Sequence, residues 1–212
     1  MAFLFKQLKF SALALLVLGV HEINVVAAPP TSPSKHSEDV GDTTGTVLQP
    51  SEMAQAYMTM LTHSGLSEEQ AAAMVGHLKV ESDNFQADLE YVPNAYGTRG
   101  RGHLQWTDSD DSGGRRSNFE AYATSKDLSP TSFEANSGFL LSEMQGNHGQ
   151  HWTSGASYQG FLQTDSIAEA STYLQNHYIR PGVPHTERRL QAARNTYRAF
   201  KRQKDSLKLI EA

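Results

Sequence analysis

The chain has 212 residues, of which 38% are hydrophobic and 9% aromatic, so part of it can bury a core and a wholly disordered protein is excluded. It contains no cysteine, which excludes a disulfide scaffold, a thiolate nucleophile and a thiolate metal site. The formal net charge of −5 makes duplex nucleic acid an unfavourable partner for the chain as a whole.

The first 27 residues have the order of a secretory signal peptide. A basic start with Lys6 and Lys9 is followed by an apolar run over residues 11–20 and by small residues that predict cleavage after Ala27. The run is well short of the about 20 residues that span a bilayer, so an uncleaved membrane anchor is the weaker alternative. We therefore expect a secreted, extracellular protein without stable membrane insertion.

Residues 28–49 are rich in Pro, Ser, Thr, Asp and Gly and poor in large apolar side chains. Such a segment cannot bury enough surface to offset the entropy of ordering it, which predicts a disordered linker. A single folded domain is expected over residues 50–204, followed by a short C-terminal tail over residues 205–212.

Helical periodicity begins directly after the linker. Ser51 is placed to cap a first helix that ends at Gly65. Ser67 and Gln70 form a capping box for a second helix, whose apolar positions continue to about Ser82.

The rest of the domain alternates loops with helices. Residues 84–106 lose the helical period and contain three glycines and scattered aromatic residues, which predicts loops with a small β-like excursion. Further helices are predicted over residues 116–125, 133–145, 166–181 and 187–204. The predicted fold class is therefore α+β but mostly α, with one small irregular or β excursion between helices.

Charge is distributed unevenly along the chain. Residues 185–212 carry eight basic and three acidic side chains, whereas residues 28–184 carry eight basic and 19 acidic ones. One interpretation is a solvated basic helix on an acidic body. The other is a basic face that docks on an anionic polymer.

Glu81 is the first candidate for chemistry. At about 100° per residue it lies roughly 60° from Leu78, on the margin of the apolar stripe, and in the last turn of its helix. Partial burial and the negative end of the helix dipole both favour the neutral acid, which can then donate a proton near neutral pH. The alternative is a glutamate that only pairs at a helix end.

Residues 100–107 combine glycines with an amide and a flat aromatic ring. Gln105 is a bidentate hydrogen-bonding group beside Trp106, and Tyr96 adds an aromatic face in the same loop. This set suits a sugar that carries an N-acetyl group, so these three are candidate substrate-binding residues. The alternative is that Trp106 packs in the core. No metal site or cofactor is predicted, because the pair His148-x-x-His151 lacks the spacing of a metallopeptidase helix.

Three segments resemble the phage tail lysozyme family. Residues 65–82 (GLSEEQAAAMVGHLKVES) are similar to the helix of that family that ends in its catalytic glutamate. Residues 102–107 (GHLQWT), followed by Arg115, are similar to its Gln-Trp-Thr segment. Residues 178–181 (YIRP), with two arginines behind them, are similar to its closing element. The three matches come in the family's order and span most of the predicted domain.

The resemblance implies a lysozyme-like fold acting on the β-1,4 bonds of peptidoglycan. Position by position, Glu81 matches the family's catalytic acid, and Gln105 and Trp106 match the wall of its cleft. The implied partner is bacterial cell-wall peptidoglycan, and we expect a monomer. The signal peptide suggests a free bacteriolytic enzyme rather than a virion part.

The sequence departs from the family pattern at three positions. His77 stands where the family usually has Asn, and Asp83 stands where it usually has Gly. Ile179 replaces an acidic residue in the closing element, so a role for an acid there is not carried over.

The second carboxylate of a glycosidase is not identified by the sequence. Asp88, Glu90 and Asp108 are the nearest candidates after Glu81. Some lysozyme-fold enzymes work with one glutamate, so a hydrolase and a lytic transglycosylase both stay open. A secreted carbohydrate-binding or effector protein without activity is the non-enzyme alternative, and it would not need to retain Glu81.

Overall fold

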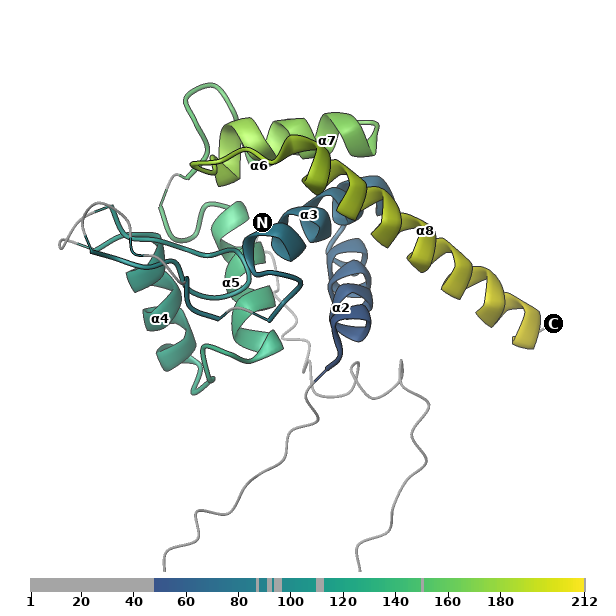
Figure 1. Ribbon diagram of the computed structural model, residues 1–212, viewed down its shortest axis with the longest axis horizontal. Helices are drawn as coiled ribbons and strands as arrows, with labels where there is room; N and C mark the ends of the chain where they lie inside the picture. Colours follow the sequence, from purple (N-terminus) through teal and green to yellow (C-terminus); the bar gives the residue numbers. More distant parts are fainter. Residues whose placement is uncertain are drawn as a thin grey trace, which may run out of the picture. The chain divides into compact units, whose positions relative to one another are not determined.

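The computed structural model describes residues 48–86, 88–90, 93, 97–109, 113–149 and 151–211 (Figure 1). The predicted signal peptide, most of the predicted linker and Tyr96 lie outside the described residues. The folded unit begins at Leu48, two residues before the predicted domain boundary.

The fold is mostly helical, as predicted from the periodicity. Its helices are α2 (Pro50–His63), α3 (Glu68–Glu81), α4 (Arg115–Ser125), α5 (Phe133–Met144), α6 (Tyr158–Phe161), α7 (Ile167–Leu174), the π-helix η2 (Gln175–Ile179) and α8 (Thr186–Glu211). Between α3 and α4 the described residues form only isolated β-bridges, which join Leu89 to Arg101, Arg101 to Trp106 and Asp108 to Gly114. The predicted β excursion is therefore not shown: the described residues of this segment are loops joined by isolated bridges.

The starts of the first two helices are set by local side chains. The prediction that Ser51 caps α2 is wrong, because Gln49 is the N-cap and its backbone N–H donates to the Glu52 carboxylate at 2.8 Å. Pro50 fits the first helical position since its missing N–H would have no partner there. The predicted capping box of α3 is confirmed, with Gln70 N–H donating to Ser67 Oγ at 3.1 Å and Ser67 N–H donating to Gln70 Oε1 at 3.0 Å.

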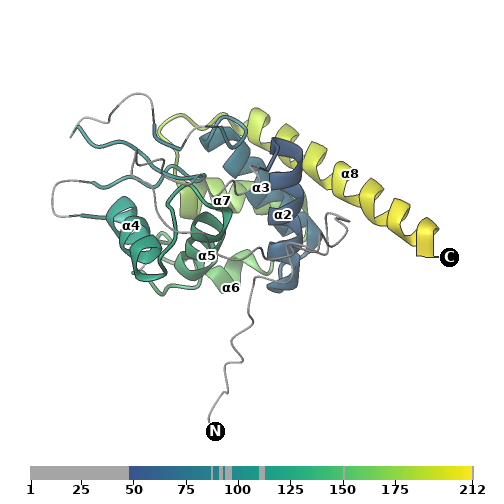
Figure 2. The ribbon, with the colours of Figure 1, turned by 90° about the horizontal axis from the view of Figure 1, so that it is seen from below.

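Helix α3 is the central element of the fold. Every residue from Gln70 to Leu78 is buried, and the helix packs against α2, α7 and α8 (Figure 2). A Cβ atom on Gly76 would lie 2.7 Å from the Cβ of Ala193, so the absence of a side chain at Gly76 lets α3 and α8 approach closely. This contact places the first turn of α8 beside the last turn of α3.

Helices α4 and α5 pack against each other on the opposite side of the fold from α8 (Figure 1). Phe119 of α4 and Phe139 of α5 are fully buried and their ring centroids lie 5.5 Å apart. Helix α5 also contacts α2, which joins this pair to the helices around α3.

Helix α8 is longer than predicted. It was expected to end near Lys204 but continues to Glu211, and its C-terminal part projects beyond the other helices (Figure 1). Lys201 and Lys204 both pair with Glu68 at the start of α3, so part of the basic face is engaged within the fold. Within the described ranges, none of the helices has the length and apolar character needed to cross a membrane.

Candidate active site

Glu81 is the last residue of α3, and the chain turns sharply after it. The Ser82 hydroxyl donates to the Leu78 carbonyl at 2.7 Å, which ends the helix. The next three residues all have left-handed φ angles: Asp83 (46°), Asn84 (62°) and Phe85 (66°). Glycine adopts such angles without strain and Asp tolerates them, which accounts physically for an Asp83 at a position where the family usually has Gly.

The Glu81 carboxyl is nearly buried against a buried cation. Its side chain is 17% exposed, and its Oε1 lies 2.7 Å from Nη1 of Arg189, whose own side chain is 2% exposed. Burial raises the pKa of Glu81 above its usual range, and the neighbouring Glu90 acts in the same direction. The charges of Arg189 and Arg115 oppose this rise without cancelling it. Glu81 is thus a carboxyl that holds a proton to higher pH than a free glutamate does.

Glu81 and Arg189 form an ion pair at hydrogen-bonding distance, and the contact lowers the pKa of Glu81, but its angle is not that of an aligned hydrogen bond. Nη1 and Oε1 are close, but no N–H is aligned on Oε1. Arg189 is instead held by its Nε, which donates to the Pro184 carbonyl at 2.7 Å. The guanidinium is therefore fixed by groups other than the carboxylate it faces.

A second buried carboxylate, Glu143 on α5, gathers residues from distant segments. Arg115 donates from Nε to Oε1 at 2.9 Å and from Nη2 to Oε2 at 2.6 Å. The Tyr178 hydroxyl and the Trp106 indole Nε1 also donate to Oε2, at 2.5 Å and 3.0 Å. We call these four residues the Glu143 cluster. It brings together the two segments that carry the family resemblance beyond α3: the Gln-Trp-Thr segment with the arginine that follows it, and the closing element.

The Glu143 cluster supports the site from one side. Burial alone would raise the pKa of Glu143, but the Arg115 guanidinium and the Tyr178 hydroxyl bring it below the usual range, so Glu143 is ionised. The charge of Arg115 also lowers the pKa of Glu81, so one guanidinium acts on both carboxyl groups. Tyr178 comes from η2, and π-helical turns of this kind often occur at functional sites.

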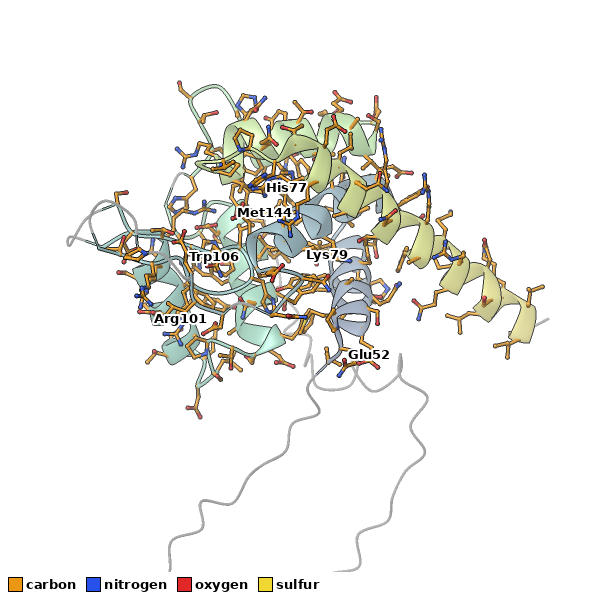
Figure 3. The ribbon with its side chains drawn as sticks, viewed as in Figure 1. Glu52, His77, Lys79, Arg101, Trp106 and Met144 are labelled. Atoms are coloured by element: carbon orange, nitrogen blue, oxygen red, sulfur yellow. The ribbon has the colours of Figure 1, made fainter. Side chains whose placement is uncertain are left out.

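The predicted role of Trp106 as a cleft wall needs correction. Trp106 is 1% exposed, and its ring lies 4.6 Å from Phe119 and 4.9 Å from Phe139, centroid to centroid (Figure 3). Because its faces are covered and its indole N–H is bound to Glu143, Trp106 is a core residue with no surface for a sugar ring. Gln105 has a left-handed φ of 52°, and its amide donates to the Gly102 carbonyl at 2.7 Å. Tyr96 lies outside the described residues.

The three candidates for a second carboxylate have different surroundings. Asp108 accepts from the Ser117 N–H at 3.0 Å and from the Ser117 hydroxyl at 2.6 Å, so it fixes the first turn of α4. Asp88 lies 3.5 Å from a guanidinium nitrogen of Arg101. Glu90 accepts from the Gly100 N–H at 2.8 Å and is the candidate whose charge acts on Glu81.

Within the described part of the chain, no group of three or more His, Asp or Glu side chains is placed to hold a metal ion. Two surface hollows, one over α7 and η2 and one beside residues 144–159, are not lined by Glu81.

Glu143 was not predicted as a site residue, because it lies within a predicted helix and far from the motifs that resemble the family. The available signal was a lone acid beside apolar residues at 139–141 and 144 of α5. The importance of Arg189 was indicated only by its position behind the closing element.

A comparison with known protein families finds a match over most of the described fold. A model of the phage tail lysozyme family matches residues 52–200, which include Glu81, Arg189 and the whole Glu143 cluster. The chain has no match among curated proteins. Since the family match covers more than half of the chain, the protein belongs to the phage tail lysozyme family, which indicates a peptidoglycan-lytic, lysozyme-like function.

Proposed function

We propose that this protein is a secreted peptidoglycan hydrolase that cleaves the β-1,4 bond between N-acetylmuramic acid and N-acetylglucosamine, with Glu81 as general acid. The observation that carries the proposal is the state of the Glu81 carboxyl, which is 17% exposed and whose pKa is raised by burial. Such a carboxyl is protonated closer to neutral pH and can donate to a leaving oxygen.

The proposed reaction follows from two carboxyl groups in different surroundings. The Glu81 proton passes to the glycosidic oxygen as the bond from that oxygen to the anomeric carbon breaks. A water molecule supplies the new bond to the anomeric carbon, and Glu90 as a carboxylate accepts the proton that the water loses. Glu90 is assigned this part because it is the candidate whose charge acts on Glu81. We also propose that Gln105 contacts an N-acetyl group of the substrate.

The test is lysis of purified peptidoglycan by the wild type and by Glu81→Gln. Glutamine keeps the shape of the side chain but has no proton to donate, so we expect lysis to fall by at least about 100-fold with little change in the thermal midpoint. Glu134→Gln, an exposed change on α5, is the matched control and should lyse like the wild type. Lysis by Glu81→Gln at the wild-type rate would remove Glu81 from the reaction.

Analysis of the products separates the two reaction types. Hydrolysis leaves reducing ends on the released sugars, whereas a lytic transglycosylase leaves anhydro ends that are lighter by one water. Reducing ends, together with a slow Glu90→Gln variant, would support the two-carboxylate reaction, and anhydro ends would refute it.

Export rests on the pattern of residues 1–27 alone. Expression of the full chain, with mass spectrometry of the protein found outside the cells, should give a chain that begins at Ala28.

A further inference from the structure

Glu81 follows His77 by four residues, so the two lie one turn apart on the same face of α3. His77, labelled in Figure 3, lies on the part of α3 that meets α7 and α8. His77 is fully buried. Its Nε2 is 3.0 Å from the Ser171 carbonyl oxygen of α7, and its Nδ1 is 3.2 Å from Nη1 of Arg189 on α8. The imidazole thus bridges the two helices that pack against the end of α3.

These contacts fix which ring nitrogen of His77 carries the proton. A guanidinium can only donate, so Nδ1 must be the acceptor for Arg189. A carbonyl can only accept, so Nε2 carries the hydrogen and donates to Ser171. Burial, followed by the charge of Arg189, lowers the pKa of His77 to about 3, so the ring stays neutral at the pH of any ordinary assay.

Arg189 thereby has two anchors that do not depend on Glu81. Its Nε donates to the Pro184 carbonyl and its Nη1 donates to His77. The contact from Nη1 to Glu81 is close but not aligned as a hydrogen bond. An arginine held only by an ion pair would lose its partner each time the carboxyl took up a proton, and a general acid must take up a proton in every cycle.

We propose that His77 is a positioning residue for the general acid: it holds the Arg189 guanidinium beside the Glu81 carboxyl in both the ionised and the protonated form of that carboxyl. This inference rests on the proposed role of Glu81. Three charged groups face Glu81 from elements packed near it: Arg189 from α8, Arg115 from α4 and Glu90 from the loop after α3. Around His77 the facing groups are Arg189 and the neutral Ser171.

Loosening Arg189 has a definite effect on the pH dependence of lysis. Arg189 opposes the protonation of Glu81, so a displaced Arg189 leaves the acid protonated to higher pH. The alkaline limb of the profile of kcat/KM against pH should then move to higher pH by about one pH unit. An opposite charge within a few ångströms lowers the pKa of a carboxyl by about one to three units, and this lowering is lost when Arg189 is displaced.

Two substitutions of His77 separate its two contacts. His77→Asn places an amide oxygen near the position of Nδ1 and keeps the acceptor for Arg189, whereas His77→Gln places its amide near the position of Nε2 and keeps only the contact to Ser171. Both are polar, and Asn is one methylene smaller than Gln and leaves the larger void, so a role in packing alone would perturb His77→Asn more than His77→Gln. We expect the alkaline limb of His77→Asn to stay with the wild type and that of His77→Gln to move upward. Equal profiles for the two variants, or a shift in His77→Asn alone, would overturn the proposal.

A measurement without activity keeps this inference separate from the proposed function. The ¹⁵N chemical shifts of the wild-type imidazole should show His77 neutral at pH 7 with hydrogen on Nε2. Hydrogen on Nδ1, or a charged ring, would overturn the positioning role even if Glu81→Gln were inactive. A normal tautomer together with an active Glu81→Gln would instead overturn the proposed function.

Discussion

The Glu143 cluster makes the stability of the fold depend on one buried negative charge. Glu143→Gln replaces a carboxylate oxygen by an NH₂ group that faces donors, because Arg115, Tyr178 and Trp106 all donate to this side chain. The Glu143 side chain has no exposure and that of Arg115 has 15%, so the guanidinium would be left buried without its counter-charge. Breaking a buried pair in this way costs about 3–5 kcal/mol. In a domain of this size that corresponds to a fall of about 6–20 °C in the thermal midpoint.

Urea unfolding followed by circular dichroism measures this loss directly. Glu120→Gln is the matched control, since Glu120 pairs with Arg101 and Arg116 at the surface, and exposed pairs contribute about 0–1 kcal/mol. A loss below about 1 kcal/mol for Glu143→Gln, or one equal to that of the control, would refute the reasoning.

The pH dependence gives a second check on Glu143. Its pKa is lower in the folded protein than in the unfolded chain, so its contribution is complete above the unfolded pKa of about 4.3 and is lost as the pH falls through the folded pKa. The stability difference between the wild type and Glu143→Gln should therefore be largest near neutral pH and shrink in acid.

Two further predictions concern the helix packing and the basic helix. Gly76→Ala should lower both stability and lysis, because the new Cβ would meet the backbone of Ala193 at 2.7 Å and overpacking costs about 1–3 kcal/mol. Gly182→Ala is the control, since a Cβ at Gly182 would meet open space. A higher thermal midpoint for Gly76→Ala than for the wild type would contradict this prediction. If α8 binds the anionic cell wall, neutralising the exposed Arg202 and Lys208 should weaken adsorption to whole cells and leave cleavage of soluble fragments unchanged. Salt that shortens the Debye length below about 8 Å should weaken adsorption in the same way. If neither change reduces adsorption, α8 is an ordinary solvated helix.

Local patterns in the sequence predicted the helices well. The capping box at Ser67 and the apolar period after it located α3 and the position of Glu81 at its end, because these signals depend on residues within one or two turns. The same reasoning placed the start of α7 behind Ser166. The end of α8 was predicted too early: the helix continues to Glu211, although its last apolar residues, Leu207, Leu209 and Ile210, are exposed and do not pack against the fold.

The site was less predictable because its contacts join residues that lie far apart in the sequence. Arg189 lies 108 positions after Glu81, and their meeting depends on the close contact of Gly76 with Ala193, which no local pattern encodes. Trp106 was ambiguous for a related reason. A tryptophan in a glycine-rich loop suits either a sugar or a core, and the buried acceptor that decides between them is 37 residues away on α5.

The Glu143 cluster also bears on the order in which the chain folds. Its members come from four segments between residues 106 and 178. The Glu143 carboxylate can therefore be buried at a low free-energy cost only when all its hydrogen-bond donors are in place. Closing so many separate loops costs chain entropy before their contacts are gained, so we expect these contacts to be absent from the folding transition state. Interactions of this kind slow unfolding more than they speed folding. We therefore expect the cluster mainly to slow unfolding of the native state, in a chain that contains no cysteine and so no disulfide bond to hold it.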